Sequence, residues 1–163
     1  MVEQKEKIAV VKEFRVRHVG LLDLKYFYKN MKRWFDHNTY NKPFNETTYD
    51  VLEFPNGKST INIFWTAVKK KTNYFHYEIS VKWILVGIQE IEIEYEGKKS
   101  KRFKGDFDIK ISSNLIKAGP RNEVRLLWEK YVMPKRVDDH ILDLYSKTNE
   151  LREWVKNYFE LYV

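Results

Sequence analysis

The chain has 163 residues, with 30 lysines and arginines against 23 aspartates and glutamates, and a formal net charge of +7. This length corresponds to one domain that is large enough to bury a core, and an apolar share of 43% is ordinary for a globular protein. The absence of cysteine excludes disulfides, thiolate zinc sites and cysteine nucleophiles, and it fits a reducing, intracellular compartment.

The sequence shows neither a signal peptide nor a membrane-spanning segment. The charged stretch Met1–Lys7 is not followed by the apolar segment of a signal peptide, and no window reaches the roughly 20 apolar residues of a membrane span. We therefore expect a cytoplasmic protein without a membrane span. Glutamine is scarce among many lysines, glutamates, isoleucines and tyrosines, a bias seen in heat-adapted proteins and also produced by AT-rich genomes.

The first part of the chain predicts a strand followed by a helix. Residues 1–7 are polar, and we expect them to be disordered. From Ile8 to Val19 apolar residues alternate with charged ones, which predicts a strand with one solvent-facing side that ends at Gly20. From Leu21 to His37 large apolar residues recur at helical spacing, with lysines on the outer side.

The middle of the chain predicts antiparallel strands. Strands are expected at Thr47–Phe54, Ser59–Val68 and Tyr74–Val86, and the first two are joined by the turn sequence Pro55-Asn56-Gly57. We expect Gly87 to mark a bend or a bulge. The two strands of a later hairpin bring the total to about six.

That later hairpin lies on either side of Gly97. A three-residue loop centred on Gly97 places Ile91 opposite Phe103, so that one face is apolar and the other carries glutamates opposite basic residues. A two-residue loop instead puts Glu90 opposite Phe103, which is the less favourable register on this reasoning. We therefore predict the three-residue loop.

The C-terminal part predicts two helices, a short one at about residues 122–133 and a long one at 137–163, separated by Pro134. The long one is indicated by an unbroken series of steps of three and four residues, which places one stripe on one side of a helix. The stripe consists of Val137, Ile141, Leu144, Thr148, Leu151, Val155, Tyr158 and Tyr162. We expect the strand-rich middle of the chain to cover it.

These elements predict a single α+β domain over residues 1–163, in which a curved antiparallel sheet of about six strands packs on a long C-terminal helix. The order of strand, helix, antiparallel strands and long last helix resembles the helix-grip fold of START domains, Bet v 1 pollen proteins and polyketide cyclase-like proteins. The resemblance implies an apolar cavity between the sheet and the last helix that holds a lipid, a sterol or another hydrophobic ligand.

Aromatic residues make up 16% of the chain, and several fall on the inward side of a predicted strand or helix. Tyrosine and tryptophan can line a ligand cavity and offer a hydrogen bond to its occupant, or they can simply fill a core. The candidate ligand-lining residues are His18, Trp65, Tyr77, Trp83, Phe103, Trp154 and Tyr158.

Nothing in the residue spacing assembles a catalytic acid, base and nucleophile, and no glycine-rich phosphate loop indicates a cofactor. Asp138, Asp139 and His140 lie together, but carboxylates in a first helical turn are expected from the helix dipole alone, so we predict no metal site. An enzymatic function is therefore not favoured.

The sequence favours a non-catalytic domain that binds a hydrophobic small molecule between the sheet and the long helix. The first alternative is a structural or protein-interaction module that self-associates through the long helix or through a sheet edge, because the heptad-like stripe suits helix pairing. Nucleic-acid binding by basic loops is less favoured. Its candidate residues are Lys69, Lys70, Lys71, Lys99, Lys101 and Arg102.

Overall fold

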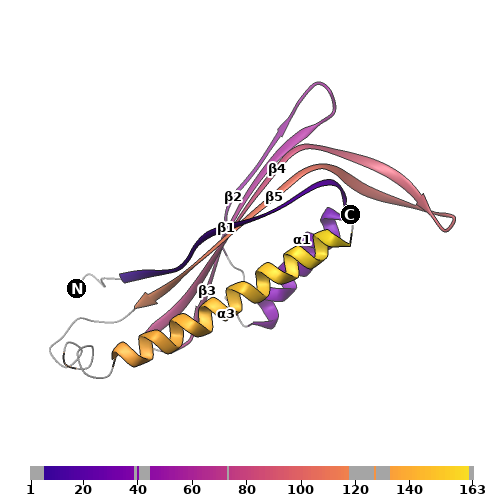
Figure 1. Ribbon diagram of the computed structural model, residues 1–163. Helices are drawn as coiled ribbons and strands as arrows, with labels where there is room; N and C mark the ends of the chain where they lie inside the picture. The colour runs from indigo at the N-terminus through magenta and orange to yellow at the C-terminus, as the bar shows by residue number, and fades with distance from the viewer. Residues whose placement is uncertain are drawn as a thin grey trace.

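A computed structural model of the chain describes residues 6–38, 40, 45–72, 74–117, 127 and 133–161. Five strands and two helices lie in this part of the chain, so the α+β class is confirmed (Figure 1). The elements are β1 (Glu6–Leu22), α1 (Leu24–His37), β2 (Asn45–Glu53), β3 (Ser59–Lys70), β4 (Phe75–Tyr95), β5 (Lys98–Lys117) and α3 (Met133–Glu160).

The strands form one antiparallel sheet in the order β1-β5-β4-β3-β2. The expected total of about six strands is wrong, because Gly87 does not end a strand. Gly87 adopts a φ of 63°, and the β4–β5 ladder shifts register between Val86 and Gln89 and then continues. A bulge of this kind bends a strand without ending it, so the segments expected on either side of Gly87 are both parts of β4.

The predicted register of the β4–β5 hairpin is also wrong by one residue. The hairpin closes with a two-residue loop, Glu96-Gly97, whose φ angles of 51° and 77° are both positive. Two positive φ angles characterise the type I′ turn, which matches the twist of the flanking strands. Consequently Glu90, and not Ile91, lies opposite Phe103.

The observed register still pairs opposite charges, because Glu92 faces Lys101 and Glu94 faces Lys99. The predicted register was chosen to place the apolar residues of the two strands on one face. In the structure, however, this end of the hairpin projects beyond both helices as an arm (Figure 1). Neither helix covers a face of the arm there, so core burial does not impose a register and the turn geometry determines it.

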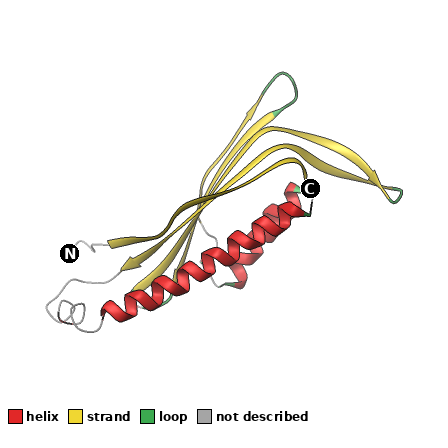
Figure 2. Cartoon of the chain, in the orientation of Figure 1, coloured by secondary structure: helices red, strands yellow, loops and turns green. Residues whose placement is uncertain are grey.

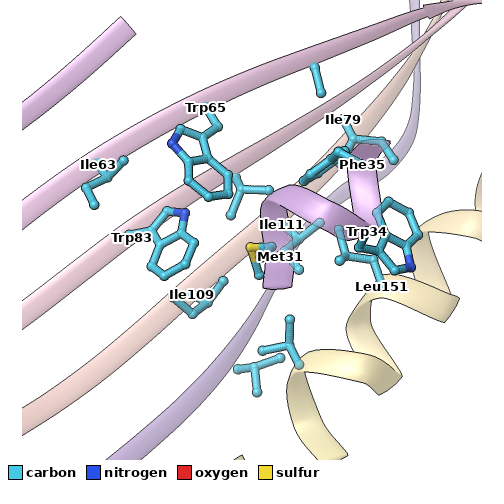
Figure 3. Packing of buried hydrophobic residues seen from close by; sticks show 14 of the residues in the cluster. Met31, Trp34, Phe35, Ile63, Trp65, Ile79, Trp83, Ile109, Ile111 and Leu151 are labelled. Carbon is cyan, nitrogen blue, oxygen red and sulfur yellow. The ribbon is translucent and has the colours of Figure 1, made fainter. Parts of the chain in front are cut away.

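Both helices lie on the same face of the sheet, side by side (Figures 1 and 2). The core lies between this helical layer and the sheet (Figure 3). Helix α1 contributes its buried residues Phe27, Met31, Trp34 and Phe35 at helical spacing. It begins at Leu24 instead of the expected Leu21, because β1 continues to Leu22 and Asp23 then caps the helix by accepting a hydrogen bond from the Tyr26 N–H.

The long helix α3 is confirmed as one uninterrupted helix of 28 residues, although it begins at Met133, before the expected Val137. The four central members of its stripe, Leu144, Thr148, Leu151 and Val155, have exposed fractions of 0%. Thr148 is tolerated there because its hydroxyl donates to Leu144 O at 2.7 Å and lies within hydrogen-bond distance, 2.9 Å, of the Ser113 hydroxyl on β5. The stripe therefore packs on the sheet as predicted.

The other face of the sheet carries ion pairs, and the structure places neither α1 nor α3 over it (Figure 2). Arg15 on β1 lies 2.6 Å from Asp108 on β5, and Lys7 on β1 lies 3.1 Å from Glu78 on β4. The predicted solvent-facing side of β1 is thus paired with acids on neighbouring strands. The short helix expected at about residues 122–133 and the end of the stripe at Tyr162 lie outside the described residues, Leu127 and Met133 excepted.

Truncating the α3 stripe should cost much more stability than truncating the exposed side of the same helix. Leu151 is fully buried, whereas 67% of Leu142 is exposed. We expect Leu151→Ala to lower the free energy of unfolding by about 2–5 kcal/mol, and Leu142→Ala to change it by less than about 0.5 kcal/mol. Equilibrium denaturant unfolding measures both, and equal costs would show that the stripe does not pack on the sheet.

Candidate functional site

The candidate site is an open apolar groove of about 450 Å³ at the end of the sheet where α1 begins. This volume lies within the range of pockets that hold small molecules. The groove is lined by residues of α1 and of strands β2 to β5. They are Leu24, Lys25, Tyr28, Val51, Ile61, Ile63, Leu85 and Phe103.

The floor of the groove is a row of side chains across three strands. Val51 on β2 pairs with Ile61 on β3, and Ile61 pairs with Leu85 on β4, so the three side chains share one face. Their exposure rises along the row, because Leu85 is 0% exposed and Val51 is 48% exposed. The groove therefore deepens from the outer strand β2 toward the centre of the sheet.

The groove stays open because the strands continue past the first turn of α1. Beyond this turn the β2–β3 and β4–β5 hairpins diverge, and the figures show no helix between them (Figure 1). A close approach between β4 and β5 supports this bend. A Cβ on Gly105 would lie 3.0 Å from the carbonyl oxygens of both Val86 and Gly87, so only glycine fits opposite the bulge.

Phe103 is the candidate ligand-lining residue that lies in the groove wall. Trp65, Tyr77 and Trp83 are instead fully buried in the core, with exposed fractions of at most 2%. The two tryptophan rings contact each other at 4.8 Å between centroids, and Phe27 of α1 covers Trp83 at 5.1 Å. Helix α1 thus fills space that the resemblance assigned to a ligand.

Trp154 and Tyr158 on α3 pack against α1. Their rings stack on Phe27 at 5.6 and 4.9 Å between centroids, and the Tyr158 hydroxyl donates to the Asp23 carbonyl oxygen at 2.9 Å. These contacts join the end of α3 to the start of α1, and neither residue is among those that line the groove.

His18 lies under the C-terminal end of α3, away from the groove lining. Its Nε2 atom is 2.8 Å from Leu21 O, and its ring centroid lies 5.5 Å from Phe159 and 6.1 Å from Phe107. A buried imidazole with a backbone partner and two aromatic neighbours is satisfied structurally.

Apart from Phe103, the residues that line the groove were not singled out from sequence, although part of the signal was present. Ile61, Ile63 and Leu85 fall on the inward sides of their predicted strands. The strand pattern does not show, however, which part of the sheet is covered by a helix. An inward-facing apolar residue has the same place in the alternating pattern whether a helix packs on it or not.

Apart from the apolar groove, a group of polar side chains lies near the start of β4. The hydroxyl of buried Tyr77 donates to Asp143 Oδ2 at 2.8 Å and lies 2.8 Å from His140 Nδ1. Lys71 lies 3.8 Å from the same Asp143 oxygen. Burial and then the hydrogen bond to Asp143 raise the pKa of Tyr77, so its hydroxyl stays protonated.

This group attaches the N-terminal half of α3 to the sheet. His140 and Asp143 are one helical turn apart, so both can reach the same hydroxyl. His140 also packs against Phe75, at 4.5 Å between ring centroids. A tyrosine hydroxyl that is both buried and occupied by two partners is suited to structural attachment and not to nucleophilic attack.

The two basic segments considered for nucleic-acid binding lie at opposite ends of β4. Lys70 pairs with His76 near the start of the strand, whereas Lys99 pairs with Glu94 near its end. At about 3.3 Å per residue the two segments are roughly 60 Å apart along the strand. They do not form one continuous basic surface.

Metal and membrane features can be assessed for the described residues. Among these, no group of three or more histidine, aspartate or glutamate side chains is placed to hold a metal ion. Within the same part of the chain, neither helix is both long and apolar enough to span a bilayer.

Comparisons with protein-family models, with curated proteins and with solved structures found no match to this chain. Function must therefore be argued from the groove and from the chemistry of its lining.

The Tyr77–His140–Asp143 group should make stability depend on pH. Burial, more than the nearby Lys71 and Arg136, lowers the pKa of His140, and Asp143 only partly opposes this. The unfolded chain, with a histidine pKa of about 6.5, then binds the proton more readily than the folded one. The contribution of His140 to stability is complete above this value and is lost as the pH falls through it.

We therefore expect wild-type protein to lose more unfolding free energy between pH 7.5 and 5.5 than the His140→Gln variant. Denaturant unfolding at both pH values measures the difference. His37→Gln is the matched control, because His37 is exposed at the end of α1, and it should behave as wild type. Parallel pH dependences for wild type and His140→Gln would contradict the assignment.

Proposed function

We propose that this protein is a non-catalytic domain that binds a hydrophobic small molecule in the groove beside α1. The observation that carries the proposal is the lining, because apolar side chains from five elements surround one recess and only one charged residue lies among them. Apolar recesses of this kind are the usual sites of small-molecule binding.

The proposal keeps the class of ligand that the helix-grip resemblance implies and changes its place. In that group the ligand lies between the sheet and the last helix. Here the α3 stripe is buried, and aromatic side chains of α1 occupy part of that layer. The resemblance itself remains a proposal based on the order of elements.

Affinity for a homologous series of ligands tests the proposal. Each additional methylene that enters an apolar groove contributes about 0.8 kcal/mol, which is about a fourfold gain in affinity. We expect linear alcohols to bind more tightly with each added carbon until the groove is full, measured by isothermal titration calorimetry. A flat series, or no binding at any length, would contradict the proposed function.

A blocking substitution locates the site, and its neighbour provides a matched control. Val51 lines the groove and Leu52 points to the opposite face of the same strand, and both are about half exposed, at 48% and 59%. We expect Val51→Trp to weaken alcohol binding at least tenfold by filling the recess, because it removes most of the buried contact of about two methylenes. Leu52→Trp should leave affinity unchanged, and equal effects of the two would place binding elsewhere.

Self-association through a sheet edge is a second candidate. β2 is the last strand in the sheet order and pairs only with β3, so its other edge is free of partners in the described sheet. Near this edge Leu52 and Phe54 are 59% and 45% exposed. Exposed apolar side chains beside a free edge favour pairing with a second strand. A concentration-independent monomer in sedimentation velocity would remove this candidate.

A further inference from the structure

Lys25 is the charged residue in the groove lining, and the other lining residues are apolar or, in the case of Tyr28, aromatic with a hydroxyl. Lys25 lies in the first turn of α1, where the groove meets solvent. A lysine at such an edge can lay its aliphatic stem along the apolar wall and keep its ammonium group in water. The ammonium group is thus available to whatever fills the recess.

The acid closest to Lys25 in the sequence, Asp23, has other partners. One Asp23 carboxylate oxygen accepts the Tyr26 N–H at 3.2 Å, and the other lies 3.5 Å from the Arg102 guanidinium. Among the side chains that the structure describes, no carboxylate forms an ion pair with Lys25. Its charge is therefore not neutralised by the described residues of the protein.

Two cations on the arm formed by the β4–β5 hairpin lie opposite acids. On the arm, Lys101 faces Glu92 and lies 3.7 Å from Glu90, and Lys99 faces Glu94. An anion would have to compete with these glutamates for the arm lysines. Lys25 offers a positive charge at the groove without such a competitor.

We propose that the occupant of the groove is a single-chain amphiphile whose tail lies on the Val51–Ile61–Leu85 row and whose carboxylate pairs with Lys25. This inference rests on the proposed function and specifies its ligand. A recess of about 450 Å³ is near the lower end of small-molecule sites, which favours one short tail over a two-chain lipid. A charge-assisted hydrogen bond from the ammonium group fixes the orientation of the tail.

The test compares ligands that share one tail and differ in the head group. Calorimetric titration below the micelle concentration would use dodecanoate, dodecan-1-ol and dodecylammonium. For wild-type protein we expect dodecanoate to bind about two- to fivefold more tightly than the alcohol, as an exposed ion pair provides, and dodecylammonium to bind most weakly. The preference for dodecanoate should shrink in about 1 M salt, where the screening length falls to roughly 3 Å.

Substitution of the lysine should remove the preference for the carboxylate. Lys25→Gln should bind dodecanoate and dodecanol with similar affinities, and Lys25→Glu should favour dodecylammonium. Lys29→Gln, one turn further along α1 and outside the groove lining, should retain the wild-type preference. Both lysines are exposed, so these variants are expected to fold, and circular dichroism would confirm it.

The possible failures can be told apart. The carboxylate inference is overturned, and the apolar site remains, if dodecanol binds but dodecanoate binds no more tightly than the alcohol. The same conclusion follows if Lys25→Gln and Lys29→Gln lose the preference for dodecanoate equally. If none of the three ligands binds, both the inference and the proposed function are overturned. Co-sedimentation with anionic phosphatidylglycerol vesicles, without binding of free dodecanoate, would assign the recognised head group to a membrane lipid and would also overturn the proposal.

Discussion

The structure depends on one requirement, which is that the long apolar stripe of α3 must be covered. A helix of 28 residues is about 42 Å long, so its stripe needs long strands beneath it. β4 has 21 residues and β5 has 20, which at about 3.3 Å per residue is more than 60 Å. The strands therefore extend further than the helix that they cover, and the uncovered ends of the sheet are available for other contacts.

The position of the groove follows from how helix α1 covers the part of the sheet beside α3. Helix α1 has 14 residues, about 21 Å, and packs beside α3 on the same face of the sheet (Figure 2). Phe27 is central to this packing, because its ring contacts Trp83 on the sheet and both Trp154 and Tyr158 on α3. Aromatic packing closes the layer at Phe27, and the groove opens one turn earlier, where Leu24 begins the helix.

Sequence reasoning recovered the features that burial determines. The α3 stripe, the inward sides of the strands and the α+β class all follow from periodicity, because an apolar residue in the wrong phase would be exposed. It failed where backbone conformation decides. The expected bend at Gly87 is present, but β4 continues past it, so the strand count was too high. The Glu96-Gly97 turn sets the register of an arm that no helix covers. The groove was missed because it depends on where α1 begins relative to the strands, and no single segment contains that information.

The central claim is that a hydrophobic ligand binds where the sheet extends past α1, and not beneath α3. Methyl-resolved NMR during titration with a linear alcohol tests it most directly, since both regions carry methyl groups. The account predicts that the resonances of Val51, Ile61 and Leu85 shift together, while those of Leu144, Leu151 and Val155 stay in place. Shifts confined to the α3 methyl groups, with the groove methyl groups unchanged, would contradict it.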